Sequence, residues 1–164
     1  MSEKIETCLF SLEVGVRWLR KDRSPEGRLP FYATPGAAGM DLIACLDEPV
    51  VLKSHERALI PTGLSLVLPG PHVVALVFAR SGQAYKRGLT MGNGVGVIDS
   101  DYTGELKVLV INQDPEQAIE IVDGERIAQV LFMPVYRANP VWVEEAPETE
   151  RGEGGFGSTG FHLT

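Results

Sequence analysis

The chain has 164 residues, of which 44 % are hydrophobic, and this fits one domain with a buried core. Its formal net charge of −7 argues against a broad surface for nucleic acid or anionic membrane, so local arginines or a metal would have to hold an anionic ligand. No apolar run approaches the roughly 18 residues of a membrane span and no signal-peptide pattern opens the sequence, so we expect a cytoplasmic protein with no nucleic-acid or membrane partner.

Short apolar runs separated by turn residues dominate the chain and predict an all-β sandwich or barrel. Asp123-Gly124 predicts a hairpin turn, because both central residues of such a turn need positive φ. The runs 72–79 and 130–135 are apolar on successive residues, which predicts burial on both faces and suggests a second subunit. The expected strands are a first one near 14–19 and then 50–52, 57–61, 64–68, 72–79, 105–112, 117–122 and 126–135.

One short helix and a tail complete the predicted organisation. The helix is expected at 81–88, where the chain ends the segment with a glycine. We predict a single β domain over 1–146, of which 1–28 form an N-terminal extension and the first strand. Residues 147–164 are rich in glycine and charge and show no periodicity, so we expect a flexible tail.

The cysteines and histidines are too scattered for a metal cluster. Cys8 and Cys45 lack zinc-ligand spacing and are too few for a disulfide framework, so we expect two ordinary, buried thiols. His55, His72 and His162 show no ligand spacing and are expected on the surface or in loops.

The tail contains RGEGGFGSTG at 151–160, which includes the pattern GxGxxG. A dinucleotide fold needs these glycines between a strand and a helix, and a kinase loop needs a catalytic lobe downstream, so both interpretations fail this close to the last residue. A solvated tail explains the glycines. A tail that closes on a ligand also explains Arg151, whose guanidinium can bind phosphate in a bidentate way, and Phe156, which can stack on a flat ring. The tail alone leaves both interpretations open.

Two further segments could supply the other half of such a site. In ARSGQA (79–84) an arginine, a serine and a glycine meet where a strand gives way to a helix, which suits an anion; a capping serine beside a solvated arginine would have the same sequence. GNGVGVIDSDYTGE (92–105) carries a glycine-rich hairpin, two aspartates and a tyrosine, and loop aspartates commonly cap turns.

A third segment is GERIAQVLF (124–132), where Arg126 and Gln129 interrupt an apolar strand and are either exposed at an edge or recruited to a site. With AAGMDLIA (37–44), all these segments resemble the five ordered motifs of the trimeric dUTP pyrophosphatases, or dUTPases. One motif would be weak evidence, whereas five in order with matching spacing, from about residue 29 to residue 160, indicate the family.

The resemblance implies a jelly-roll-like β-barrel or sandwich that forms a homotrimer with shared active sites. The tail of one subunit would act as a lid on a site made by two others. The implied reaction is the hydrolysis of dUTP to dUMP and pyrophosphate by water attack on the α-phosphorus, which keeps uracil out of DNA and supplies dUMP. The implied cofactor is Mg²⁺ on the triphosphate, with no direct protein ligand and with Asp41 near the metal's water shell.

The resemblance also assigns catalytic roles. Asp99 is the expected base for the attacking water, and we expect Asp101 to be structural. Arg80 would contact the phosphate chain and Ser81 would bond near the departing bridging oxygen. Gln129 would lie near phosphate and metal-bound water.

The expected substrate contacts come from the hairpin and the tail. Tyr102 would lie against the deoxyribose and leave no space for a 2′-hydroxyl, while Asn93 and the backbone of 92–97 would read uracil and reject a 5-methyl group. In the tail, Arg151 would bind the outer phosphates and Phe156 would stack over the base. The remaining expected contacts are Gly82, Gly96, Val97, Gly157, Ser158 and Thr159, of which the last three would wrap the γ-phosphate.

The second motif departs from the family pattern at two positions. Ala79 and Gln83 stand where proline and a small apolar residue are usual, and we expect altered packing without loss of activity. Two alternatives stay open: a dCTP deaminase-like enzyme of the same fold, although ARSGQA lacks its second serine and later arginine, and a catalytically silent nucleotide-binding trimer. A serine hydrolase using Ser81 is disfavoured because GxSxG is absent from the sequence.

Overall fold

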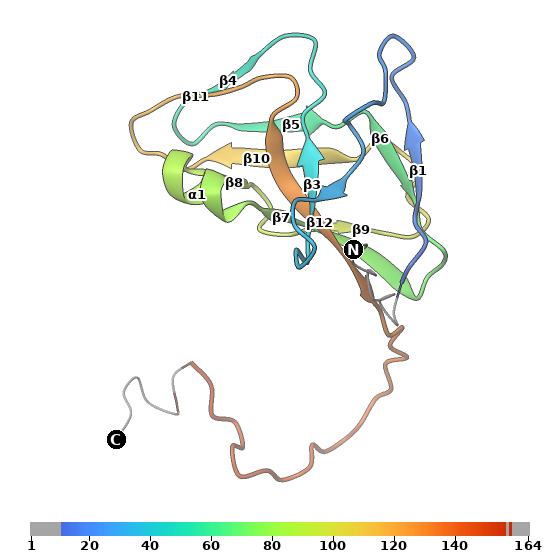
Figure 1. Ribbon diagram of the computed structural model, residues 1–164. Helices are drawn as coiled ribbons and strands as arrows, with labels where there is room; N and C mark the ends of the chain where they lie inside the picture. The colour runs from blue at the N-terminus through green and yellow to red at the C-terminus, as the bar shows by residue number, and fades with distance from the viewer. Residues whose placement is uncertain (1–10, 157, 159–164) are drawn as a thin grey trace, which may run out of the picture.

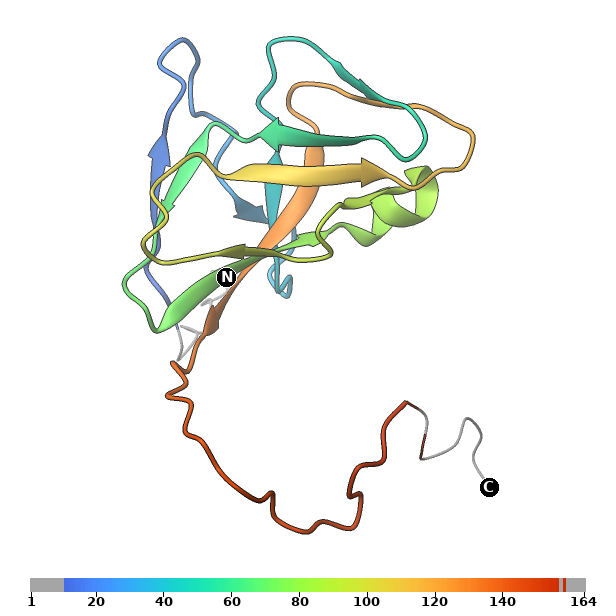
Figure 2. The same cartoon turned by 180° about the vertical axis from the view of Figure 1, so that it is seen from behind.

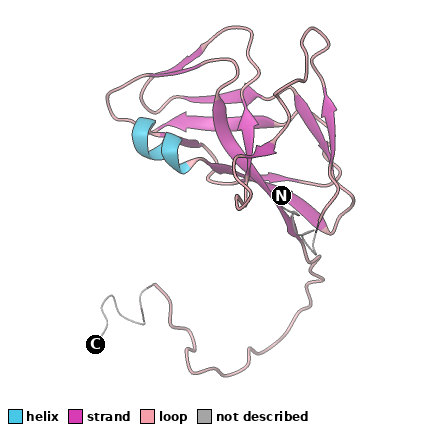
Figure 3. Cartoon of the chain, viewed as in Figure 1, coloured by secondary structure: helices cyan, strands magenta, loops and turns pink. Residues whose placement is uncertain are grey.

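The described part of the chain is a β structure with one short helix. The computed structural model describes residues 11–156 and 158. Within them, strands β1–β12 and helix α1 confirm the expected all-β class (Figures 1 and 3). In chain order the elements are β1 (Gly15–Trp18), β2 (Phe31–Tyr32), β3 (Met40–Ile43), β4 (Val50–Leu52), β5 (Arg57–Pro61), β6 (Leu64–Val67), β7 (Val73–Ala79), α1 (Ser81–Arg87), β8 (Leu89–Met91), β9 (Gly96–Ile98), β10 (Lys107–Asn112), β11 (Ile119–Ile121) and β12 (Arg126–Pro134).

The strands form antiparallel sheets that pack as a jelly-roll-like body. The largest sheet has five strands in the order β2-β3-β12-β7-β9, and a second sheet has the order β5-β10-β8. Two further pairs, β1-β6 and β11-β4, complete the described strands. In Figures 1 and 2 the long strand β12 crosses the body, and it pairs with β3 on one side and β7 on the other. This central position of β12 brings residues of three distant segments to one place.

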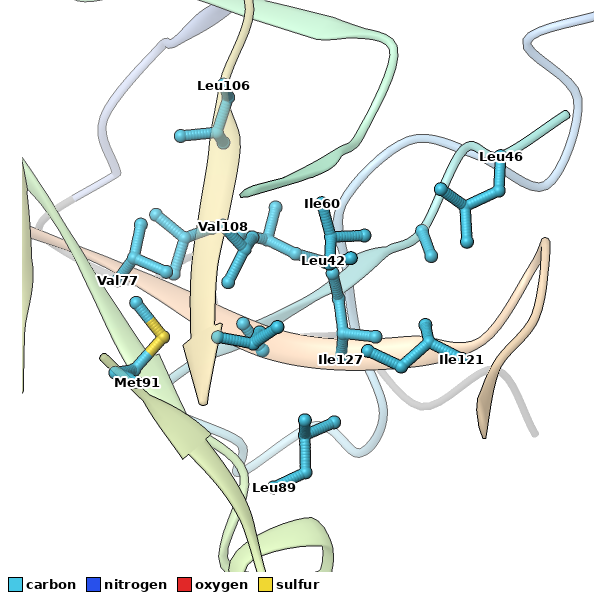
Figure 4. Close-up of a cluster of buried hydrophobic side chains, with 14 of the residues drawn as sticks. Leu42, Leu46, Ile60, Val77, Leu89, Met91, Leu106, Val108, Ile121 and Ile127 are labelled. Carbon is cyan, nitrogen blue, oxygen red and sulfur yellow. The ribbon is translucent and has the colours of Figure 1, made fainter. Parts of the chain in front are cut away.

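The hydrophobic core lies between the sheets and follows the alternation of the strands. Along β10, Val108 and Val110 are buried while Leu109 between them is partly exposed. Leu42 from β3 and Ile60 from β5 are fully buried in the same cluster (Figure 4). Burying one such side chain contributes about 1.5–3 kcal/mol relative to leaving it exposed, so this cluster fixes which face of each strand points inward.

Strand β7 is buried on one face and half covered on the other. Val73, Ala75 and Val77 are buried, whereas Leu76 and Phe78 are partly exposed. The expected burial on both faces is therefore not found in the single chain. The cause is positional: β7 lies inside the five-stranded sheet, and the core covers one side of that sheet.

The Asp123-Gly124 turn does not join a hairpin, so that prediction is wrong. The turn itself forms, with Glu125 N donating to Val122 O at 3.2 Å. However, β11 pairs with β4, while β12 pairs with β3 and β7. Gly124 has φ 81°, but Asp123 is not among the described residues with positive φ, so the turn lacks the geometry of a two-residue hairpin.

The loop over residues 19–30 is fastened to the body by ion pairs that involve the same turn. Arg28 Nη2 lies 2.6 Å from Asp123 Oδ2, and Arg23 Nη2 lies 2.6 Å from Asp47 Oδ1. The hydrogen-bonded Arg28 guanidinium holds the pKa of the Asp123 carboxyl below its ordinary value, against the opposing effect of partial burial. The aspartate that looked like a hairpin residue is thus the anchor of a loop.

The chain leaves the body after β12. Figures 1 and 2 show the last described residues as a long single trace beside the body. Its large side chains are open to solvent: Tyr136 is 98 % and Trp142 is 94 % exposed. The described part of the predicted tail, residues 147–156 and 158, lies within this segment, which follows the end of β12 at Pro134.

The remaining sequence expectations concern single residues and membranes. Cys45 is a free, buried thiol, as expected, while Cys8 lies outside the described residues. His55 and His72 are exposed, as expected, and His162 also lies outside the described part. None of the helices in the described chain is long and apolar enough to cross a membrane.

Candidate functional site

One cleft collects the expected site residues of three separate motifs. It has a volume of about 460 Å³ and lies where β3, the end of β7 and α1 meet. Its lining includes Asp41, Arg80, Ser81, Gly82 and Gln129. They converge because Gln129 on β12 pairs with Asp41 on one side and with Phe78, next to the end of β7, on the other.

Asp41 is the centre of the charge network in this cleft. Its side chain is almost fully buried, and its two carboxylate oxygens each face a guanidinium. Arg80 Nε lies 2.8 Å from Oδ1, and Arg126 Nη1 lies 3.1 Å from Oδ2. A buried carboxylate needs such partners, because leaving it unpaired would cost several kcal/mol. The pairing fixes Arg80, which lines the cleft, and binds Arg126 to the same carboxylate.

The start of α1 presents a serine and a glycine to the cleft. Arg80 occupies the N-cap position with φ −87° and ψ 128°, and no side chain of the described residues caps the helix. Ser81 is the first helical residue and is exposed, so the alternative of a capping serine is wrong. A Cβ added at Gly82 would meet no described atom within 4 Å, so packing does not require glycine there. The helix ends at Gly88 with φ 70°, as expected.

Gln129 is oriented by the backbone of β7. Its Nε2 donates to the carbonyl oxygen of Ala79 at 2.9 Å, and its own side-chain carbonyl faces Gly39, which lines the cleft. That carbonyl lies 2.6 Å from the position of a Cβ built on Gly39. Glycine at position 39 therefore makes the space that Gln129 occupies.

The expected catalytic base lies in a different hollow. Asp99, Asp101 and Arg137 line a second cleft of about 390 Å³ at the far end of β7. Asp99 opens a turn in which Tyr102 N donates to Asp99 O at 3.2 Å. Tyr102 is 47 % exposed, and its hydroxyl donates to Glu105 O at 2.9 Å.

A full strand separates the two clefts within one chain. Ile98 pairs with Ala75, so Asp99 lies beside the start of β7, whereas Arg80 follows directly after the last residue of that strand. About six residues of strand, roughly 20 Å, lie between them. One chain therefore holds the expected phosphate-binding group and the expected base too far apart for a single reacting phosphorus.

The glycine-rich hairpin that leads to Asp99 is exposed at its tip. Asn93 and Val97 point to solvent, the latter 61 % exposed. Gly96 is buried, and a Cβ added to it would lie 3.1 Å from Val77 Cβ. Packing against Val77 is therefore sufficient to explain glycine at position 96, whether or not the residue also contacts substrate as expected.

Comparison with known proteins identifies the family. The sequence pattern of the dUTPase family matches residues 26–160. The chain belongs to the dUTPase family. It is 52 % identical over 150 residues to a deoxyuridine 5′-triphosphate nucleotidohydrolase of Desulfitobacterium hafniense (strain DSM 10664 / DCB-2), covering 92 % of this chain and 97 % of that one.

Solved dUTPases share the fold. The Staphylococcus bacteriophage 80alpha dUTPase with dUpNHpp has a TM-score of 0.77 and 29 % identity, covering 91 % of this chain and 99 % of that one. A mutant dUTPase from phage phi11 of S. aureus, described for the coordination of a structural Mg(II) ion, has a TM-score of 0.70 and 24 % identity over 83 % of this chain and 99 % of that one. The second comparison supports the fold alone.

The tail of this dUTPase makes local contacts within its described residues. Arg151 Nε donates to Gly154 O at 2.8 Å, and Ser158 N donates to Gly155 O at 3.1 Å. Phe156 is fully exposed and has φ 47°, a left-handed conformation that is uncommon outside glycine. Two other expected contacts, Gly157 and Thr159, lie outside the described residues.

Sequence reasoning missed two residues near the expected site residues, Lys86 and Gly39, and it missed the partner of a third, Arg126. Arg126 was singled out as a polar residue on an apolar strand, yet its partner Asp41 lies far away in sequence and gave no signal. Lys86, on α1, lines the first cleft beside the expected residues. Gly39 stands in the first motif, but the need for glycine appears only when Gln129 is placed against it.

Proposed function

We propose that this dUTPase hydrolyses dUTP to dUMP and pyrophosphate in the cytoplasm, as a homotrimer with shared active sites. The observation that carries the proposal is the division of the motif residues between two clefts at opposite ends of β7. Each cleft holds half of the required chemistry. A second copy of the chain can bring the missing half to each cleft, as closed symmetric assemblies allow.

The first cleft is suited to the phosphate chain. Arg80 holds Asp41 through Nε, so its fixed guanidinium can direct other N–H groups at phosphate oxygens. The exposed Ser81 hydroxyl and the open backbone at Gly82 add donors where the bridging oxygen leaves with pyrophosphate. Donors held in place before the reaction stabilise the charge that develops in the transition state.

The second cleft is suited to the nucleoside and the water. The Asp99 carboxylate takes a proton from the water while the water oxygen bonds to the α-phosphorus. The bond between the α-phosphorus and the bridging oxygen breaks, and pyrophosphate leaves. The Tyr102 ring, held by its bond to Glu105 O, closes the space where a ribose 2′-hydroxyl would lie. The hairpin tip with Asn93 and Val97 presents backbone groups to uracil.

The donor chemistry of Asp41 fits Mg²⁺ held through water. Both of its oxygens already face arginines, so Asp41 is better placed to accept from metal-bound water than to ligate directly. Mg²⁺ on the triphosphate would neutralise charge on the phosphate oxygens. The carbonyl of Gln129, on the same side of the cleft, can orient a water in that shell.

The tail would serve as the lid. The extended chain from Val135 to Phe156 can span up to about 70 Å, so it reaches well beyond its own domain. Arg151 would then meet the outer phosphates and Phe156 the uracil ring, with residues 157–159 around the γ-phosphate. Closure expels water from the site, which strengthens the contacts of the arginines with phosphate.

Nucleotide hydrolysis tests the reaction and the lid together. The full chain and a chain that ends at Glu150 are incubated with Mg²⁺ and dUTP, UTP, dTTP or dCTP, and their oligomeric state is measured. We expect only dUTP to be hydrolysed, and truncation to abolish turnover while the oligomer persists. Release of ammonia from dCTP would instead establish the deaminase alternative, and four untouched nucleotides would establish the silent trimer.

Mixing two inactive variants tests whether the sites are shared. Chains with Arg80→Ala and with Asp99→Asn are unfolded and refolded together, so that trimers contain both. We expect up to about a quarter of wild-type activity, because random mixing unites the intact halves at about one site in four. The matched control mixes Arg80→Ala with Gln129→Ala, whose defects lie in the same cleft, and should recover nothing. Absence of recovery in the first mixture contradicts shared sites.

A further inference from the structure

Gln83 joins the start of α1 to the start of β12 through every polar atom of its side chain. Its Nε2 donates to Arg126 O at 3.1 Å and to Glu125 Oε1 at 2.9 Å. Its Oε1 accepts from Arg87 Nη1 at 3.1 Å. Gln83 is partly buried and lines the first cleft, so these contacts lie at the wall of the site.

The carbonyl of Arg126 is an acceptor that Gln83 shares with Arg80. Arg80 Nη1 donates to this oxygen at 3.1 Å, as Gln83 Nε2 does. The side chain of Arg126 in turn reaches Asp41, the other partner of Arg80. Arg80 is therefore held at two points, and Gln83 fixes one of them.

We propose that Gln83 is a positioning residue that orients the Arg80 guanidinium toward the phosphate chain by holding the carbonyl of Arg126. The inference rests on the proposed function, since Arg80 acts there on phosphate. It goes beyond the expected change in packing at this position. An apolar side chain at 83 could fill the same volume, but it would leave this carbonyl without its second donor.

Charged groups on both sides support this role over a purely structural one. Arg87 and Glu125 are hydrogen-bonded to each other and each binds Gln83, so the amide lies within a paired network. Such a network restricts the rotamer of Gln83, which places Nε2 at a defined position. A misplacement of about 1 Å in a catalytic group can cost up to a hundredfold in rate, so we expect a shift of the Arg126 carbonyl beside Arg80 to lower kcat.

The test is a double-mutant cycle on dUTP hydrolysis with Gln83→Met and Arg80→Lys, alone and combined. Methionine keeps the volume of glutamine and removes its hydrogen bonds, and lysine keeps the charge of arginine without its fork. We expect Gln83→Met to lower kcat by about five- to tenfold in the wild-type background, and by less than about twofold when Arg80 is already lysine. The KM for dUTP should change less than kcat.

The matched control is Gln113→Met, an exposed glutamine whose backbone N, not its side chain, donates to Gly88 O. It should retain wild-type turnover, and thermal unfolding should show all variants folded. An equal loss of kcat from Gln83→Met in both backgrounds, or no loss in the wild-type background, overturns the proposal. A wild-type chain that leaves dUTP intact overturns the proposed function instead, before any variant is compared.

Discussion

At the scale of single residues, two glycines make room for side chains of the proposed site. Gly39 leaves space for the carbonyl of Gln129. Gly104 leaves space for the Tyr102 ring, since a Cβ at 104 would lie 2.6 Å from the tyrosine hydroxyl oxygen. Neither glycine has a φ that demands glycine, so steric room is the physical reason for both.

Gly39→Ala should therefore disable Gln129 without unfolding the protein. The added methyl group would push the Gln129 side chain from its bond to Ala79 O, and we expect kcat to fall by about tenfold to a hundredfold. Steady-state hydrolysis of dUTP and thermal unfolding measure the two effects. Gly36→Ala is the control, because a Cβ there meets no described atom within 4 Å. Equal activity of the two variants would contradict the role of the space.

Gly104→Ala should relax the selection of deoxyribose. The methyl group would displace the Tyr102 ring, so a 2′-hydroxyl would meet less steric exclusion. We expect the ratio of kcat/KM for dUTP over UTP to fall by about tenfold. Tyr102→Phe keeps the ring and loses only its bond to Glu105 O, so it should change the ratio less. An unchanged ratio in Gly104→Ala would show that the ring does not set it.

At the scale of elements, the loop over residues 19–30 is held by charge. Arg28 pairs with Asp123 in the turn before β12, and Leu46 N also donates to Asp123 Oδ1 at 3.0 Å. Because β12 carries Gln129 and pairs with β3, this turn sets where the central strand begins. The side chain of Asp123 is 37 % exposed, so solvent screens the pair and its contribution is modest.

Asp123→Asn should change the acid sensitivity of the fold. The folded-state pKa of Asp123 is lowered by Arg28, so its stabilisation is complete above the unfolded pKa of about 3.9. It is lost as pH falls through the folded value. We expect wild type to exceed the variant in free energy of unfolding at pH 7, and the difference to shrink below about pH 4. Urea unfolding at both pH values measures it, and a constant difference would contradict the assignment.

At the scale of the whole molecule, the segment after β12 carries apolar side chains that its own domain leaves uncovered. Val141, Trp142 and Val143 are 74 %, 94 % and 66 % exposed. A second copy in the proposed trimer is the partner that would cover them. The tail would then be anchored near its start, while its glycine-rich end stays able to open and close.

Tryptophan emission can report this anchoring. The chain has two tryptophans, so Trp18→Phe leaves Trp142 as the single reporter. We expect its emission at shorter wavelength in the assembled protein than in dissociated chains, because burial removes water from the indole. Emission like that of free tryptophan at every protein concentration would show that the segment stays uncovered in the assembly.

Periodicity and turn residues were enough to predict the class of the fold and the helix at 81–88. The expected residues of the first cleft came instead from the resemblance of the motifs to the family. The sequence did not predict which strands pair with one another. Asp123-Gly124 has the composition of a hairpin, but β11 pairs with β4 and β12 pairs with β3 and β7, and Asp123 binds Arg28, which is far away in the sequence. The need for glycine at position 39 was not predicted either, because it depends on Gln129, which lies on another strand.

The first cleft is a small positive region on a molecule of net charge −7. At low ionic strength the screening length is long, so an approaching triphosphate meets the net negative field and is repelled before it reaches the cleft; at physiological ionic strength that length falls to about 8 Å. Within the cleft it meets Arg80, Lys86 and Arg87 and is attracted. Added salt therefore reduces the long-range repulsion of the triphosphate, and it also weakens the attraction of the triphosphate to the cleft. Productive encounters should be most frequent at an intermediate ionic strength, where neither effect dominates.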